Sequence, residues 1–179
     1  MIIQTGRPTE KREEVEEKVY DFLDQLNVPF NRVDHKPAYS MALCENIEKI
    51  LKAPIYKNLF LSNTQGTKFY LLVTLGNKKF KTKEISKQLG VARLSFGKEE
   101  KMIEYLSCTP GSASILGILF DKTQQVQLLI DEDIMNNDYF GCHPCQNTST
   151  LSISTEDLFK KIIPYSQHEY IKVKVNEMS

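Results

Sequence analysis

The chain has 179 residues, 41% of them hydrophobic and 26% charged, which is enough for one domain, residues 1–179, with a core of its own. Its net charge of zero excludes an argument for nucleic-acid binding from overall charge, and its apolar runs are too short to span a bilayer. Four cysteines require no disulfide framework, and the amino-terminal residues lack the apolar core of a signal peptide, so we expect a cytoplasmic protein.

The first 50 residues are predicted to form a helix, a short strand and a second helix. Apolar residues recur at helical spacing over residues 9–27, with Thr9 as a candidate N-cap, and the outer face of this helix is acidic and unsuited to RNA. Residues 29–37 alternate as a strand does. Ser40 is then expected to cap a helix that turns one face toward the next element, with Met41, Leu43, Cys44 and Ile47 on that face.

Residues 53–75 are predicted to form a β-hairpin around which the rest of the chain is organised. Two apolar runs, residues 55–61 and 69–75, flank a cluster of turn-forming residues at 62–66. Lys57 lies inside the first strand. On pattern alone, such a lysine more commonly lays its stem on the sheet and holds its ammonium group in water. The hairpin therefore does not by itself give Lys57 a role.

Basic residues gather around this hairpin. Residues 50–101 carry 11 basic and 3 acidic side chains, whereas the two flanking parts of the chain are net negative. The pattern allows two interpretations, a phosphate-facing surface near the hairpin or a solvated face that keeps the protein soluble. The residues concerned are Lys78, Lys79, Lys81, Lys83, Lys87, Arg93, Lys98 and Lys101.

Beyond the hairpin, helices and strands are predicted to alternate. A helix over residues 82–89 is closed by a C-terminal glycine, and residues 91–96 and 98–108 suggest a strand and a further helix. Residues 109–121 begin with small side chains and become a strand, which we expect to pair with residues 126–131 as a second hairpin.

The remaining elements complete the fold class. Residues 132–154 are predicted to hold a short helical turn, a loop and a strand. A helix capped by Ser154 and stopped by Pro164 follows, and residues 170–175 alternate as an edge strand. The sequence therefore predicts an α+β fold, in which a mixed, mostly antiparallel and bent sheet is surrounded by four or five helices.

The run Cys142-His143-Pro144-Cys145 has the C-x-x-C spacing of a dithiol redox site. Such a site needs its first cysteine at a helix N-terminus, whereas here a strand is predicted to follow. Zinc binding is also disfavoured, because a second pair of ligands is missing and Cys142 and His143 are adjacent. Thiols without a role are the default interpretation, and a redox protein is kept as a third alternative.

Several enzyme classes leave no signature. The chain has no serine flanked by glycines on a strand-to-helix elbow, no phosphate loop ending in Gly-Lys-Ser/Thr and no G-x-G-x-x-G. Serine hydrolysis of this type, nucleotide hydrolysis and dinucleotide redox chemistry are therefore excluded.

Two loops remain candidates for a role in catalysis or binding. In Pro110-Gly111-Ser112-Ala113-Ser114, small side chains let backbone N–H groups approach a carbonyl or the oxyanion that it becomes. His143 and Asn147 lie on a second loop. Taken singly, these residues are more simply explained by the start of a strand and by a hydrogen-bonded loop histidine.

Taken in order, the segments VDHKP, KNLFL, TPGSASILGILFD, HPCQNTSTLSIS and EDLFK resemble the YbaK/ProX family of aminoacyl-tRNA editing proteins, and in particular its free-standing prolyl-tRNA deacylase branch. The resemblance extends over nearly the whole chain, from Val15 to Val175. It implies a hydrolase that removes alanine wrongly attached to tRNA(Pro), in trans and without a metal or other cofactor. The implied partners are the acceptor end of this tRNA and, transiently, prolyl-tRNA synthetase, but neither DNA nor a membrane.

The resemblance also implies a set of site residues. Lys57 matches the family's essential strand lysine, residues 111–115 take the place of its Gly-x-x-x-Pro loop, and His143 begins its His-Pro pair. The residues implied to carry the reaction are Lys57, Gly111, Ser112, Ala113, Ser114 and His143, and those implied to bind substrate are Met41, Cys44, Asn58, Ile115, Cys142 and Asn147. Ile115 stands where the loop has its closing proline, so that φ is not fixed there.

These residues suit an ester that is already activated. The site need only place a water and stabilise charge on the carbonyl oxygen, and the vicinal ribose hydroxyl can assist. Lys57 is implied to position the terminal ribose or phosphate, the backbone near Gly111 to grip the carbonyl, and His143 to shape a pocket that excludes the proline ring by size. The alternative from another class is a binding module without catalysis that recognises a tRNA end or an amino acid, as the change at Ile115 suggests.

Overall fold

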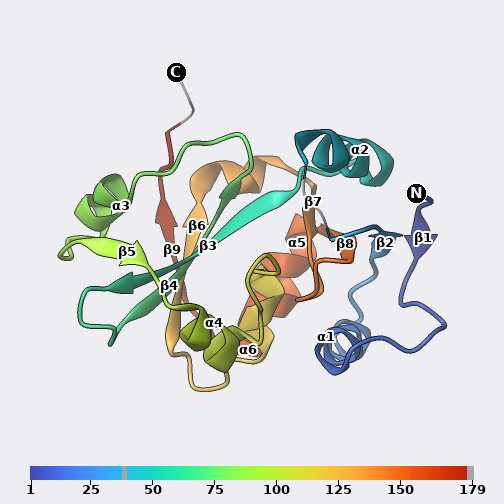
Figure 1. Ribbon diagram of the computed structural model, residues 1–179, viewed down its shortest axis with the longest axis horizontal. Helices are drawn as coiled ribbons and strands as arrows, with labels where there is room; N and C mark the ends of the chain where they lie inside the picture. The colour runs from blue at the N-terminus through green and yellow to red at the C-terminus, as the bar shows by residue number, and fades with distance from the viewer. Residues whose placement is uncertain (38–39, 177–179) are drawn as a thin grey trace.

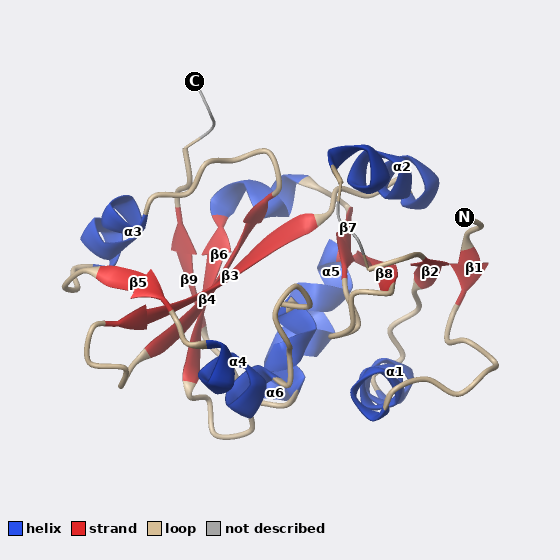
Figure 2. Ribbon diagram, viewed as in Figure 1, coloured by secondary structure: helices blue, strands red, loops and turns tan. Residues whose placement is uncertain are grey.

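The computed structural model describes residues 1–37 and 40–176. Over these ranges the chain forms two β-sheets with helices packed around them (Figures 1 and 2). One sheet has the strand order β5-β3-β4-β6-β9, and the other the order β1-β2-β8-β7. The strands are β1 Gln4–Thr5, β2 Asn31–Asp34, β3 Tyr56–Asn63, β4 Phe69–Leu75, β5 Leu94–Phe96, β6 Val126–Asp131, β7 Tyr139–Cys142, β8 Ser149–Ser154 and β9 Tyr170–Val173.

The helical segments lie between and around the strands. The α-helices are α1 Glu14–Gln25, α2 Met41–Leu51, α3 Thr82–Leu89, α4 Glu99–Leu106, α5 Thr155–Asp157 and α6 Ile163–Ser166. Two 3₁₀ helices, η1 Ile115–Leu119 and η2 Glu132–Asn136, and a π-helical turn, η3 Leu158–Ile162, complete the set.

The predicted hairpin is confirmed and divides the core. β3 pairs antiparallel with β4 from Tyr56 to Ser62. Since successive side chains of a strand point to opposite faces, Tyr56 and Phe60 join the main core, whereas Leu59 and Leu61 join a second cluster beneath α3. Positions 57 and 58 therefore lie on opposite faces of β3.

The second predicted hairpin is wrong. Residues 115–119 form the 3₁₀ helix η1, in which every residue is buried, and β6 pairs in parallel with β4 and β9. A short continuous apolar run fits a buried helix as well as a strand. Ser114 favours the helix, because its Oγ accepts the N–H of Leu116 at 3.1 Å, as an N-cap does.

The first helix begins later than the sequence predicted. α1 starts at Glu14, not near Thr9, because Glu17 anchors the residues before it. Its carboxylate accepts hydrogen bonds from the side chain of Arg7 at 2.7 Å and from the backbone N–H of Arg12 at 2.9 Å. The intervening chain is thereby held outside the helix.

The C-terminal helical segment continues past Pro164, contrary to the prediction. Pro164 lies in the first turn of α6, directly after the π-helical turn, where its missing N–H is tolerated. The two predicted serine caps are confirmed: Ser154 Oγ accepts the N–H of Asp157, and Ser40 Oγ accepts the N–H of Leu43, both at 3.0 Å.

The sheets meet between Ile55 and Gly141. These residues form a parallel bridge, and the N–H of Gly141 donates to the carbonyl of Pro54 at 2.7 Å. A Cβ at position 141 would lie 3.1 Å from Ile55 Cγ1, so glycine permits this approach. The α+β architecture with mostly antiparallel strands is confirmed, and its strands are divided between two sheets that meet at this bridge, where the prediction had one bent sheet. No helix in the described ranges is long and apolar enough to cross a membrane.

Candidate functional site

A cleft of about 360 Å³ opens beside the start of β3. This strand end lies next to α2, since the N–H of Ile55 donates to Glu48 Oε1 at 3.0 Å, and next to β7 (Figure 1). The cleft brings together the predicted lysine strand, the glycine loop and the histidine loop. Its walls are formed by Cys44, Ile55, Tyr56, Lys57, Asn58, Gly76, Gly111, Ala113 and His143.

Lys57 is half-buried at the wall of the cleft. Its Nζ donates to the backbone carbonyl of Lys78 at 2.9 Å, which fixes the ammonium group at the turn after β4. An ammonium group carries three donors, so this bond leaves further N–H groups for a ligand. Lys57 thus offers a positioned positive charge.

Lys78 corrects one expectation. It is 2% exposed and does not contribute to a phosphate-facing surface, because its ammonium pairs with Asp131 at 2.9 Å and Asp133 at 2.6 Å. Burial lowers its pKa, but the hydrogen bonds to the two carboxylates outweigh burial and the pKa is raised. Lys101 is also paired, with Glu104 at 3.0 Å. The buried pair at Lys78 holds the turn whose carbonyl receives Lys57.

Asn58 carries an unusual buried atom. Its Nδ2 donates to the carbonyl of Tyr56 at 3.2 Å. Its Oδ1 is the one buried side-chain polar atom without a hydrogen-bond partner among the described residues. Buried acceptors are nearly always satisfied, so this oxygen is a candidate acceptor for a ligand that enters the cleft.

Gly111 forms the tip of a tight turn. The N–H of Ser112 donates to the carbonyl of Thr109 at 2.9 Å, and Gly111 has φ of 82° with Pro110 before it, the arrangement of a type II turn. Asn147 flanks this turn, with its Nδ2 3.6 Å from where a Cβ of Gly111 would lie. Gly111 is exposed at the cleft, whereas Asn147 does not line it.

Ser112 and Ser114 are buried and serve the loop. Ser112 Oγ accepts from Thr109 Oγ1 at 3.2 Å, and Ser114 Oγ donates to the carbonyl of His143 at 2.6 Å. Ile115 is fully buried at the start of η1. The loop is therefore held by hydrogen bonds and core packing where a closing proline is absent.

His143 is oriented by its backbone neighbourhood. Its Nδ1 lies 2.8 Å from the carbonyl of Ser149, an assignment that puts the proton on Nδ1 and leaves Nε2 as an acceptor. Burial lowers the pKa of His143, and His35, with its ring centroid 6.1 Å away, adds to this effect. His143 is thus neutral at pH 7.

A charged network holds the side chain of Ser149 in place. Ser149 Oγ donates to Asp34 Oδ1 at 2.6 Å, and Asp34 also accepts hydrogen bonds from Arg12 and Arg32. Burial raises the pKa of Asp34, but these hydrogen bonds outweigh burial and lower it to about 2. The carbonyl that orients His143 is therefore anchored to a rigid part of the fold.

Besides Asn147 and Ile115, two more residues expected to bind substrate do not line the cleft. Met41 is 83% exposed at the first position of α2, one turn before Cys44, which does line the cleft. Cys142 is fully buried, and burial raises the pKa of its thiol. Contact with Cys108, followed by burial, raises the pKa of Cys145. A reactive thiolate needs a lowered pKa, whereas the pKa of both thiols is raised, and this disfavours the redox alternative.

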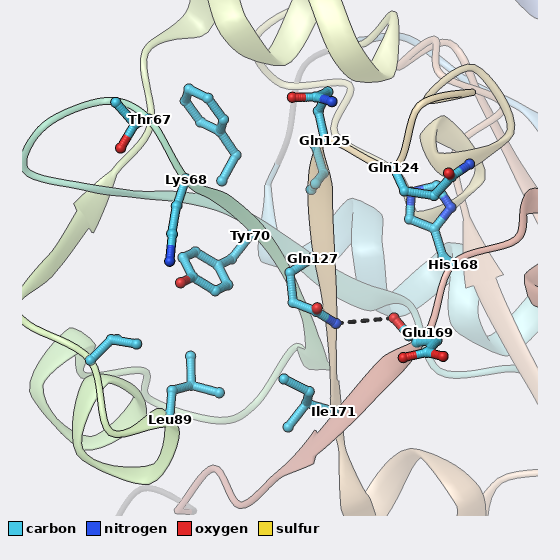
Figure 3. A pocket seen from close by; sticks show the side chains of 13 residues that line it. Thr67, Lys68, Tyr70, Leu89, Gln124, Gln125, Gln127, His168, Glu169 and Ile171 are labelled. Atoms are coloured by element: carbon cyan, nitrogen blue, oxygen red, sulfur yellow. Dashed lines mark hydrogen bonds between the residues drawn. The ribbon is translucent and has the colours of Figure 1, made fainter.

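Another cavity, of about 340 Å³, lies at the opposite end of the hairpin and contains none of the predicted site residues (Figure 3). His168 faces it, but the ring is bound to Asp121 at 2.9 Å and to Ser166 at 3.0 Å. Gln127 donates to the carbonyl of Glu169 at 3.0 Å across the strands. Both of these polar side chains are engaged in hydrogen bonds within the fold. Within residues 1–37 and 40–176, no group of three or more His, Cys, Asp or Glu is placed to hold a metal ion.

Residues 35–161 match the family model of the aminoacyl-tRNA editing domain. The chain belongs to this family. The editing domain is 33% identical over 138 residues to the prolyl-tRNA editing protein ProX of Acetoanaerobium sticklandii, with 77% of this chain and 84% of that protein covered. The resemblance seen in the sequence is confirmed, as is the enzyme class, an aminoacyl-tRNA deacylase.

Other relatives agree in extent and in fold. A prolyl-tRNA synthetase associated domain-containing protein of Danio rerio is 24% identical over 163 residues, covering 90% of the editing domain's chain and 85% of its own. The crystal structure of a candidate trans-editing enzyme for prolyl-tRNA synthetase superposes with a TM-score of 0.68 at 12% identity, covering 94% and 100% of the two chains. At this identity the superposition supports the fold alone.

Sequence reasoning missed Ile55, Tyr56 and Gly76 as wall residues. Ile55 and Tyr56 have the pattern of core residues in the strand. Their position next to Lys57 in the sequence was the one signal that could have placed them at the site. Gly76 follows β4, and a Cβ there would lie 3.3 Å from the carbonyl of Ile55. No sequence signal identified the carbonyl of Lys78 as the acceptor for Lys57.

Proposed function

We propose that this editing domain hydrolyses the ester between alanine and tRNA(Pro), acting in trans on tRNA released by prolyl-tRNA synthetase. The observation that carries the proposal is the cleft in which Lys57, Gly111 and His143 meet. Family membership supports the reaction class, and the name of the Acetoanaerobium relative supports the choice of a prolyl tRNA.

The glycine turn supplies donors for the ester carbonyl. Among the described residues, the N–H groups of Gly111 and Ala113 have no backbone acceptor, and both residues line the cleft. Donors already held in place stabilise the negative charge that develops on the carbonyl oxygen without reorganisation. The neighbouring N–H of Ser112 is used within the turn and maintains its shape.

Lys57 and Asn58 hold the ends of the substrate. The ammonium group of Lys57, fixed by the carbonyl of Lys78, positions the terminal ribose or its phosphate. The orphan Oδ1 of Asn58 accepts a hydrogen bond from a donor of the substrate, such as the α-ammonium group of the amino acid. A water attacks the carbonyl with help from the vicinal ribose hydroxyl, so that no protein nucleophile is needed.

Selectivity follows from size. The wall residues Cys44, Ile55 and Ala113 surround the amino-acid end with small or apolar side chains, and neutral His143 closes it. A methyl side chain fits where a proline ring meets the wall, and rejection of a larger group by size is the stronger form of discrimination. Correctly charged prolyl-tRNA is therefore spared.

A deacylation assay tests this proposal. The protein is incubated with tRNA(Pro) charged with alanine or with proline, and the remaining charged tRNA is measured over time. We expect rapid loss of alanine, little loss of proline and no effect of a chelator. Binding of both charged tRNAs without release of either amino acid would support the non-catalytic alternative and reject the proposal.

A further inference from the structure

Unpaired positive charge lies along one segment beside the cleft. Between β4 and β5 the chain is basic, and Glu84 is the one acidic residue from position 79 to position 98. The basic residues of this segment are all exposed, and no ion pair joins them to any residue the structure describes. We define the α3 surface as Lys79, Lys81, Lys83, Lys87 and Arg93.

Outside residues 50–101 the chain is net negative, and its exposed lysines are of two kinds. Lys18 pairs with Glu14 at 3.0 Å and Lys160 with Glu156 at 2.8 Å, whereas Lys11 and Lys122 have no ion pair with a described residue. On α3, by contrast, Lys83 and Lys87 repeat one turn apart on the solvent side, an arrangement of like charges that destabilises a helix. The cations of the α3 surface therefore add no ion pair to the stability of the fold. Their charge suits an anionic partner.

The α3 surface is continuous with the cleft. Lys57 lies on the face of β3 that packs beneath α3, and its ammonium group bonds to the carbonyl of Lys78, the residue before Lys79. The loop that leaves β4 then runs to α3, away from α1 (Figure 1). A single loop thus joins the catalytic lysine to the first charge of the surface.

An aromatic pair adjoins these charges. Phe96 on the edge strand β5 is 65% exposed, and its ring centroid lies 6.0 Å from that of Phe80, between Lys79 and Lys81 in sequence. Aromatic side chains interleaved with basic ones are typical of surfaces that bind RNA, because bases or sugars stack on the rings while phosphates meet the cations.

We propose that the α3 surface binds the phosphate backbone of the tRNA whose aminoacyl end enters the cleft, with Phe96 as a stacking contact. This inference rests on the proposed function for the identity of the RNA. The phosphates of an RNA strand attract a row of cations along a loop and a helix, and each phosphate neutralised releases counterions and makes binding depend on salt.

The test compares two quadruple variants with equal loss of charge. In the first, Lys79, Lys81, Lys83 and Lys87 are changed to Gln; in the control, Lys11, Lys18, Lys122 and Lys160 are changed to Gln. Binding of uncharged tRNA(Pro) is titrated at several salt concentrations, and hydrolysis of the alanyl ester of a CCA trinucleotide is measured separately. Phe96→Ala is analysed in the same series.

We expect the first variant to bind tRNA at least about ten-fold more weakly, with the slope of log K against log salt reduced by about 3. The control should keep the wild-type slope. Phe96→Ala should weaken binding without changing the slope. Hydrolysis of the trinucleotide ester should be unaffected by either quadruple variant, since that substrate presents the aminoacyl end to the cleft and lacks the rest of the tRNA backbone.

An unchanged slope in the first variant, or equal losses in both quadruple variants, would overturn the α3 surface while leaving the deacylase intact. If the wild-type protein fails to hydrolyse the trinucleotide ester and charged tRNA alike, the proposed function fails instead. The tRNA titration still decides the role of the α3 surface in that event, because it requires no catalysis.

Discussion

The buried pair between Lys78 and Asp131 offers a quantitative test of how the cleft is built. In Lys78→Met the apolar stem is kept and the ammonium group is lost, so that fully buried Asp131 faces no cation. Removing one partner of a buried ion pair costs about 3–5 kcal/mol of unfolding free energy. Asp133 can turn to solvent, since its side chain is 41% exposed.

The structure places the expected loss near the lower end of that range. Asp131 keeps the hydroxyl of Thr74 at 2.6 Å and the N–H of Asp133 at 3.1 Å, which offset part of the lost interaction. We therefore expect Lys78→Met to lower the unfolding free energy by ~3 kcal/mol, as measured by urea unfolding at pH 7. Adding Asp131→Asn to Lys78→Met should recover part of this loss, because the uncompensated charge is then gone.

Lys79→Met is the matched control. Lys79 is exposed and has no ion pair with any described residue, so its loss should change the unfolding free energy by no more than about 0.5 kcal/mol. If Lys78→Met is as stable as Lys79→Met, the buried pair does not anchor the turn and the reasoning about Lys57 loses its support.

Three further predictions follow from the site. Gly111→Ala should reduce deacylation at least ten-fold and destabilise the protein by about 1 kcal/mol, because φ of 82° strains any residue with a Cβ; wild-type rates would refute the role of the turn. His143 has a lowered pKa in the folded protein, so the stability it contributes is present above its ordinary pKa and is lost as pH falls below about 6.5; urea unfolding from pH 7.5 to 5 should show this decline, and His143→Gln should lessen it. Replacing Cys142 and Cys145 with Ala should leave deacylation intact under reducing and oxidising conditions, and its abolition in a variant that remains folded would revive a thiol mechanism.

The sequence predicted elements that depend on local signals. Ser40 and Ser154 cap helices as their side chains suggest, and the turn formers between β3 and β4 make the hairpin. The run after Ser114 was predicted as a strand but forms a 3₁₀ helix, and the sequence did not separate the two because buried strands and buried helices share the same apolar pattern. The parallel partners of β6 come from distant parts of the chain and leave no local trace.

The candidate site shows the same division. The stretches around Lys57, Gly111 and His143 were identified from the sequence, and the fold brings all three to one cleft. Side-chain direction was less accessible: Met41 and Cys44 share a helix, yet the first is exposed to solvent and the second faces the cleft. In the sequence, Lys78 resembles its exposed neighbours. The carboxylates that pair with it, Asp131 and Asp133, come from a distant part of the chain and could not be predicted as its partners.

The rate of alanine release from tRNA(Pro) by Lys57→Ala, compared with Lys68→Ala at the other end of the same hairpin, tests the central claim most directly. Both variants remove one partly or fully exposed lysine, and only Lys57 lines the cleft. We expect kcat/KM to fall on the order of 100-fold for Lys57→Ala, with unfolding free energy unchanged, and to stay at the wild-type value for Lys68→Ala. Equal activity of the two folded variants would contradict the assignment of this cleft as the editing site.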